Sequence, residues 1–126
     1  MMTENDISYI IRGAIFNVYN SLGPGLLESA YEVALAYELR KSELLIETQV
    51  SIPMVYEEVR MEVGYRLDIL VNKKVIIEIK SVENLLDIHH KQLLTYLKLS
   101  NLKLGLLVNF NSDDISNAIF RKVNGL

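Results

Sequence analysis

Apolar residues recur at helical spacing in two stretches at the start of the chain. From about Asn5 to Asn20 they are three or four positions apart, which predicts a helix with Asn5 or Asp6 as its N-cap. Gly23-Pro24-Gly25 interrupts this pattern, and such a cluster breaks a helix. A second helix is predicted from about Leu26 to Lys41. The chain therefore begins with two helices joined by a short loop.

The pattern then changes to the alternation of apolar and polar residues that is typical of strands. Three strands are predicted, at residues 47–56, 59–71 and 75–82. Pro53 favours an edge position for the first strand because proline cannot donate a hydrogen bond to a neighbour. Gly64 indicates a bulge in the second. The three strands follow one another through short turns, so we expect them to pair antiparallel.

The last third of the chain mixes the two patterns. It predicts a helix at 88–99, an apolar strand at 102–110 and a final amphipathic helix at 114–122. The order is therefore α-α-β-β-β-α-β-α, and the last strand can return parallel to an earlier one through a right-handed crossover. We expect one α/β domain over residues 1–126, with a mixed four-stranded sheet flanked by helices.

Composition fits this picture and sets limits on it. The 126 residues suffice for one hydrophobic core, and no apolar run approaches the roughly 20 residues of a membrane span. The acidic start of the chain differs from a secretory signal, and without cysteine there is neither a disulfide nor a thiolate metal site. We therefore expect a cytoplasmic protein that does not associate with membranes.

The net charge of −3 argues against non-specific binding of nucleic acid through a basic face. A metal site built from acidic residues would lower the net charge in the same way, and the bound cations would reverse it locally. Charge alone therefore leaves a nucleic-acid partner open.

Three charged residues interrupt strands that otherwise consist of apolar residues: Asp68, Glu78 and Lys80. Charged side chains are rarely buried unless they are paired or bind a metal. Glu78 and Lys80 are two apart and share a face of their strand. A three-residue turn at 72–74 would place Asp68 opposite Glu78, whereas a two-residue turn would place it opposite Ile77 on the other face. We predict the three-residue turn, or a bulge of the same parity.

Two interpretations fit this trio. In the first, Asp68 and Glu78 bind Mg²⁺ or Mn²⁺ together with the backbone carbonyl of Ile79, since hard cations prefer oxygen ligands. Lys80 would then orient or help to deprotonate the water that attacks a phosphodiester and would stabilise the developing charge. In the second, Lys80 forms a structural salt bridge with Asp68 or Glu78.

The helix predicted at 88–99 carries further polar residues. Gln92 and Tyr96 are four apart, with His89 one turn earlier on the same face. They could position a phosphate or a metal-bound water; alternatively, Tyr96 is a core aromatic residue and Gln92 a solvated neighbour. His89 and His90 point about 100° apart on a helix and cannot hold one metal together. We interpret both as structural or surface residues, with His89 a weak candidate for the site.

Glu28 falls in the first turn of the second predicted helix. An acidic residue there interacts favourably with the helix dipole, which is sufficient reason for its presence. The functional interpretation directs Glu28 at the same metal ion as Asp68 and Glu78.

Gly25-x-x-Glu28-x-x-Tyr31 resembles the pattern after which the GxxExxY family is named, a family placed within the PD-(D/E)XK nuclease superfamily. The likeness extends over nearly the whole chain. It includes Leu22-Gly-Pro-Gly-Leu-Leu-Glu28, Tyr65-Arg-Leu-Asp68, Ile77-Glu78-Ile-Lys80, Gln92-Leu-Leu-Thr-Tyr96-Leu-Lys98 and Leu106-Leu-Val-Asn-Phe110.

The resemblance implies a restriction-endonuclease-like core of order α-β-β-β-α-β, which agrees with the order predicted from pattern. It also implies metal-binding acids at Asp68 and Glu78 and a catalytic lysine at Lys80. Gln92-x-x-x-Tyr96 looks like the additional motif of the RecB-like branch, and Glu28 looks like the upstream acid of that branch.

The chain departs from the family pattern at two positions. Leu67 replaces the proline of the superfamily name, a common change. Tyr19 stands where many GxxExxY members have a histidine, which removes one potential metal ligand or phosphate contact.

Three functional hypotheses follow. The first is a Mg²⁺- or Mn²⁺-dependent nuclease that acts on DNA or, as the less favoured alternative, on RNA. The second is a catalytically silent nuclease-like module that binds nucleic acid or a protein partner. The third is hydrolysis of a small nucleotide or another phosphodiester by the same residues. A homodimer or a larger complex would enlarge the small surface that 126 residues offer to a duplex.

Overall fold

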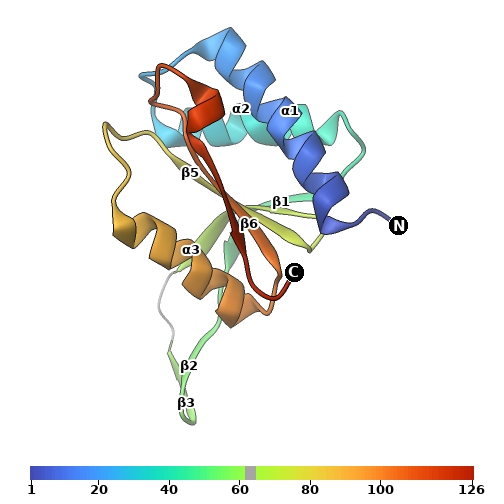
Figure 1. Cartoon of the computed structure of the whole chain (residues 1–126). Coiled ribbons are helices and arrows are strands. Elements are labelled where there is room, and N and C mark those ends of the chain that lie inside the picture. Colours follow the sequence, from blue (N-terminus) through green and yellow to red (C-terminus); the bar gives the residue numbers. More distant parts are fainter. Residues whose placement is uncertain (62–64) are drawn as a thin grey trace.

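The computed structural model describes residues 1–61 and 65–126, in which helices pack on both faces of a mixed sheet (Figure 1). The helices are α1 (Glu4–Leu22), α2 (Glu28–Arg40), α3 (Asp87–Ser100) and the 3-10 helix η1 (Ile115–Asn117). The strands are β1 (Ile46–Ser51), β2 (Met54–Tyr56), β3 (Val59–Met61), β4 (Arg66–Val71), β5 (Val75–Lys80), β6 (Leu104–Asn109) and β7 (Ile119–Val123).

The sheet confirms the predicted fold class with one strand more than expected. Its order is β1-β4-β5-β6-β7, with β5 and β6 parallel and the other neighbours antiparallel. The predicted parallel return after the crossover helix is therefore correct. The prediction of a four-stranded sheet is wrong because a fifth strand closes the β6 edge.

That fifth strand replaces the helix predicted at 114–122. Ile115, Ala118 and Ile119 fit helical spacing, but only η1 forms there, and β7 then pairs antiparallel with β6. Every residue of β6 is buried. Without β7, the N–H and C=O groups along one side of this buried strand would have no partners, and pairing them outweighs the local helical pattern.

Two predicted strands are each divided into two. Residues 47–56 form β1 and β2, and residues 59–71 form β3 and β4. Strand β1 lies at the edge of the sheet, as predicted, and Pro53 follows its end. The bulge predicted at Gly64 lies outside the described residues.

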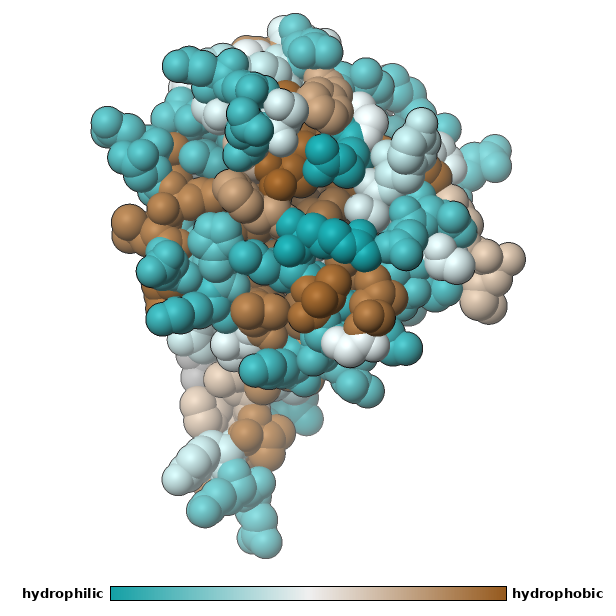
Figure 2. Space-filling view, viewed as in Figure 1, coloured by the Kyte–Doolittle hydropathy of each residue, from teal (hydrophilic) through white to brown (hydrophobic). Residues whose placement is uncertain are grey.

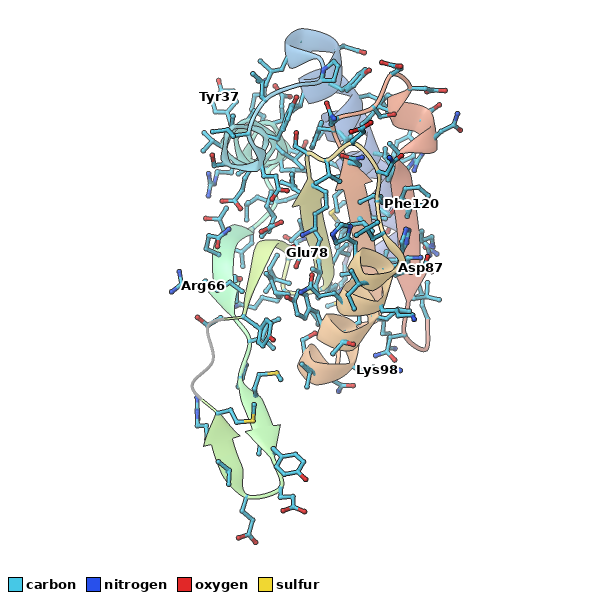
Figure 3. All side chains as sticks on the ribbon, turned by 90° about the vertical axis from the view of Figure 1, so that its left-hand side faces the viewer. Tyr37, Arg66, Glu78, Asp87, Lys98 and Phe120 are labelled. Atoms are coloured by element: carbon cyan, nitrogen blue, oxygen red, sulfur yellow. The ribbon has the colours of Figure 1, made fainter. Side chains whose placement is uncertain are left out.

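Strands β2 and β3 form a separate hairpin, closed by a turn at Glu57-Glu58, that projects from the body (Figures 1 and 3). Figure 2 shows apolar side chains along this hairpin and a hydrophilic end, and Val55 and Val59 are exposed on it.

The capping of α1 differs from the expectation of Asn5 or Asp6 at the N-cap. Thr3 is the N-cap: its hydroxyl accepts a hydrogen bond from the Asp6 N–H at 3.1 Å. In return, the Thr3 N–H donates to the Asp6 carboxylate at 2.9 Å. This reciprocal capping box satisfies two N–H groups at the helix end.

Two apolar clusters hold the layers together. One lies between the sheet and α1 and α2, and the other between the sheet and α3. Gly105 on β6 sets how closely α3 approaches the sheet, since a Cβ there would lie 2.8 Å from Leu93 Cδ1.

None of the helices in residues 1–61 and 65–126 combines the length and apolar character that crossing a bilayer requires.

The turn between β4 and β5 has three residues, as predicted. Val71 pairs with Val75, and the intervening Asn72 and Lys73 have φ values of 51° and 54°. The Asn72 side chain accepts from the Leu45 N–H at 2.8 Å, which fixes the turn against the start of β1. This parity decides which face of the sheet receives the charged residues.

Candidate functional site

The register of β4 and β5 brings Asp68 level with Glu78. The last regular pair is Ile69 with Ile77, and Asp68 and Glu78 come one step beyond it. There the Asp68 carboxylate accepts a hydrogen bond of 2.8 Å from the backbone N–H of Ile79. A carboxylate therefore sits where the strands stop pairing.

Glu78 is 7% exposed, and its position is costly for a charged group. Burial, together with the hydrogen bond and charge of the adjacent Asp68, raises the pKa of Glu78 to about 10. Its Oε1 atom has no hydrogen-bond partner within the described residues. Near neutral pH, in the absence of a cation, the Glu78 carboxyl group therefore keeps its proton.

Lys80 ends β5, two residues after Glu78, and is half-buried. Its positive charge partly opposes the rise in the pKa of Glu78, so the ammonium lies near that carboxyl group. The ion pairs found in the described part of the chain join Lys41 to Glu38 and Lys73 to Glu47. Lys80 therefore does not form the structural salt bridge of the second interpretation.

Asp68 lines a pocket of about 380 Å³, here called the Asp68 pocket. It is lined by Glu28, Ser29, Glu32, Gln49, Asp68 and Ile79. Glu28 lies in the first turn of α2, as predicted, and its carboxylate accepts a hydrogen bond of 3.3 Å from the Ser81 N–H. The structure thus brings Glu28, Asp68 and Ile79 to one cavity, with Glu78 beside it.

Glu32 and Gln49 are two lining residues that sequence reasoning missed. Gln49 Nε2 donates to Glu32 Oε1 at 2.6 Å and lies 3.5 Å from Asp68 Oδ1. Burial raises the pKa of Glu32, and the charge of Asp68 adds to the effect. Glu32 could have been found, since it follows Glu28 by four residues on one helix face. Gln49 carries no comparable sequence signal.

The loop before α2 and the start of α2 are fixed by hydrogen bonds to Ser81, directly after β5, next to the Asp68 pocket. Gly25 has a φ of 99°, a conformation that disfavours residues with a Cβ. The Ser81 hydroxyl donates to the Leu26 carbonyl at 2.6 Å. Ser81 therefore holds both Leu26 and Glu28, which sets the start of α2 against the end of β5.

The candidate site residues on α3 lie outside the Asp68 pocket. Gln92 and Tyr96 line a separate pocket of about 230 Å³ with Tyr65. Burial raises the pKa of Tyr96 to about 12, and Glu78 contributes, so Tyr96 lies near that carboxyl group. His89 Nδ1 accepts from the Leu86 N–H at 3.1 Å and caps the helix, in accord with a structural role.

The donor set suits a hard cation that keeps some of its water. Within the described residues, no three histidine or acidic side chains are gathered closely enough to hold a metal ion by themselves. Mg²⁺ commonly needs only one or two carboxylates, with water completing its coordination. The adjacent Asp68 and Glu78 carboxyl groups and the unpartnered Glu78 Oε1 meet that requirement.

A comparison with protein families identifies the superfamily of this chain. Residues 5–122 match a family model described as the PD-(D/E)XK nuclease superfamily. The chain belongs to this superfamily. Neither the curated proteins nor the solved structures gave a match. Members of the superfamily are typically nucleases that use divalent metals, so nuclease activity is the function class that membership indicates.

Proposed function

We propose that this superfamily member is a nuclease that hydrolyses phosphodiester bonds in DNA with the help of Mg²⁺ or Mn²⁺. The observation that carries the proposal is the half-buried Asp68 next to the buried Glu78, with Lys80 beside them. Burial, together with the hydrogen bond and charge of Asp68, raises the pKa of Glu78 to about 10, and Glu78 Oε1 has no hydrogen-bond partner among the described residues. Such an arrangement costs stability unless a cation compensates it.

Asp68 and Glu78 would hold the metal, with the backbone carbonyl of Ile79 as a further oxygen ligand. Glu28 lines the same pocket as Asp68 and would assist, directly or through a bound water. When bound, the ion supplies charge neutralisation at the phosphate and a more acidic water.

Lys80 would act at the reacting phosphate. Its Nζ can hold the attacking water by a hydrogen bond and can neutralise charge that develops on phosphate oxygens. The absence of a salt bridge from Lys80 to Asp68 or Glu78, within residues 1–61 and 65–126, leaves the ammonium available for this role.

Tyr96 and Gln92 would position the phosphate from α3. The Tyr96 hydroxyl keeps its proton at neutral pH, as an ordinary tyrosine does, and its pKa of about 12 extends its role as a hydrogen-bond donor to higher pH. Gln92 lines the same pocket and offers an amide donor.

We also assign the chain to the GxxExxY family and the RecB-like branch of the superfamily. The support is the arrangement of Gly25, Glu28 and Tyr31: a loop with positive φ, a carboxylate in the Asp68 pocket and a buried ring on the same helix. In this arrangement, Glu28 takes the place of the upstream acid.

The test is cleavage of end-labelled single- and double-stranded DNA and RNA, with Mg²⁺, with Mn²⁺ and with a chelator. Wild type is compared with Lys80→Ala and with Lys103→Ala, a control in which an exposed lysine is removed. We expect metal-dependent cleavage of DNA that Lys80→Ala reduces by at least about 100-fold and Lys103→Ala leaves unchanged. Circular dichroism establishes that both variants fold.

Cleavage that is equal in wild type and Lys80→Ala would indicate a contaminating nuclease and would overturn the proposal. If no substrate is cut while DNA still binds, the chain is a silent nucleic-acid-binding module. Cleavage of RNA alone would retain the mechanism and change the substrate.

A further inference from the structure

A second pocket, of about 620 Å³, opens at the carboxyl ends of the parallel strands β5 and β6. We call it the Asn109 pocket; its lining includes Asn84, His90, Asn109, Asn111, Asp113 and Phe120. Asn109 pairs with Lys80 across the two strands. Paired residues of neighbouring strands project from the same face at a spacing of about 5 Å. The pocket therefore begins next to the proposed catalytic lysine.

The pocket lies where many α/β proteins bind their ligands. Strands β5 and β6 are joined through α3 as a βαβ unit, and in open α/β sheets ligands bind outside the carboxyl ends of parallel strands. Figure 3 shows Phe120 above Asp87, near the first turn of α3. The His90 ring meets the Phe120 ring edge-on, with centroids 5.0 Å apart, and forms the α3 side of the pocket.

The walls of the pocket are held by hydrogen bonds within the protein. Asn109 Oδ1 accepts from the Val82 N–H at 3.1 Å, and Asn109 Nδ2 donates to the Val82 carbonyl at 2.9 Å. The Asn111 N–H donates to the same Oδ1 atom at 3.2 Å. From α1, the Tyr19 hydroxyl donates to the Ser112 carbonyl at 2.5 Å. A pocket fixed from several elements is preformed, which lowers the entropy cost of binding.

The lining chemistry distinguishes this pocket from a phosphate site. None of the described residues that line it is a lysine or an arginine, whereas Glu83 and Asp113 contribute carboxylates. These carboxylates disfavour a phosphate as the occupant of the pocket. Carboxylates and amides such as those of Asn84 and Asn111 instead suit the amino, imino and carbonyl groups on base edges, and Phe120 adds an aromatic surface.

We propose that the Asn109 pocket binds one unpaired nucleobase of the substrate, next to the phosphate held at Lys80. This inference rests on the proposed nuclease function and specifies its substrate: a single strand, or a strand end released from pairing. The volume lies within the roughly 300 to 1,000 Å³ of ordinary small-ligand pockets. A base can enter such a pocket only when it has left the helical stack.

The test measures binding by fluorescence anisotropy, with labelled single-stranded DNA and the metal omitted so that no cleavage occurs. A set of otherwise identical oligonucleotides carries one abasic position, moved stepwise along the strand. We expect one position at which loss of the base, and of its stacking, weakens binding about 10-fold, which corresponds to about 1.4 kcal/mol. The double variant Asn84→Ala/Asn111→Ala should bind intact and abasic strands equally, whereas the Asn20→Ala control should behave as wild type.

The outcomes separate this proposal from the nuclease proposal. If wild type cuts DNA in a Lys80-dependent way but every abasic strand binds as tightly as the intact one, the base pocket is wrong and the nuclease function stands. The same conclusion follows if the double variant still discriminates against the abasic strand. If neither DNA nor RNA is bound or cut, both proposals fail.

Discussion

The ring of Tyr31 on α2 stacks on the ring of Phe110, directly after β6, with centroids 4.3 Å apart and planes 4° from parallel. The Tyr31 hydroxyl also donates to the Gly23 carbonyl at 2.5 Å and accepts from the Leu26 N–H at 3.2 Å. One buried side chain thus ties α2 to the sheet and to the loop before the helix. Glu28, one turn earlier on α2, is positioned by this anchor.

Removing the Tyr31 hydroxyl tests this anchor. Tyr31→Phe keeps the stacked ring but leaves the Gly23 and Leu26 backbone groups without their partner. We expect the free energy of unfolding to fall by about 1 to 2 kcal/mol, measured by urea denaturation. Tyr37→Phe on the exposed side of the same helix is the control and should change stability little. An equal loss in both variants would contradict the role of the hydroxyl.

The raised pKa of Glu78 predicts a pH dependence of the metal-free protein. The pKa is about 10 in the folded state and near 4.5 in the unfolded chain, so between these values the folded state binds the extra proton. Stability from this group is therefore complete below about pH 4.5 and is lost as the pH rises, by about 1.4 kcal/mol per pH unit.

Glu78→Gln removes this titration. With a chelator present, the variant should be more stable than wild type at pH 8, and the difference should shrink toward pH 5. Urea denaturation across this range provides the measurement. Addition of Mg²⁺ should raise the Tm of wild type alone, because only a carboxylate pair gains from the cation. Parallel stability curves for the two proteins would show that Glu78 is ionised without metal.

Two substitutions at Asp68 separate its structural role from metal binding. Asp68→Asn keeps an oxygen that can accept from the Ile79 N–H, whereas Asp68→Ala leaves that buried donor unpaired. We expect Asp68→Ala to be about 1 to 3 kcal/mol less stable than Asp68→Asn, and both to lose stabilisation by Mg²⁺. Thermal unfolding with and without Mg²⁺ measures both effects. Full stabilisation of Asp68→Asn by the metal would exclude Asp68 as a charged ligand.

The close contact between α3 and β6 gives a prediction for the fold. Gly105→Ala would place a Cβ 2.8 Å from Leu93 Cδ1, so we expect a loss of about 1 to 3 kcal/mol as α3 is displaced. Gly13→Ala is the matched control: no atom of the described residues lies within 4 Å of its Cβ, and alanine should stabilise α1 by about 0.5 to 1 kcal/mol. Opposite changes in Tm would support this packing, whereas equal changes would contradict it.

The sequence alone predicted those features that depend on residues close together in the chain. The spacing of apolar residues located α1, α2 and α3, because side chains on one face of a helix recur every three or four residues. The same reasoning, together with a three-residue turn, placed Asp68 level with Glu78, because strand register alone decides the face. The GxxExxY spacing marked Glu28 and Tyr31, which the structure places at the Asp68 pocket and in the core.

Only the tertiary structure could show the features that depend on contacts between segments far apart in the sequence. Residues 119–123 form β7 rather than a helix because β6 needs a neighbour along its open edge. Glu32 and Gln49 join the Asp68 pocket because α2 packs beside β1, a contact between segments whose order in the chain does not reveal it. The Glu78 Oε1 atom, which has no partner in the described part of the chain, and the Asn109 pocket likewise arise from packing. Periodicity determines which face a residue occupies, whereas burial and pairing depend on which surfaces meet when the chain folds.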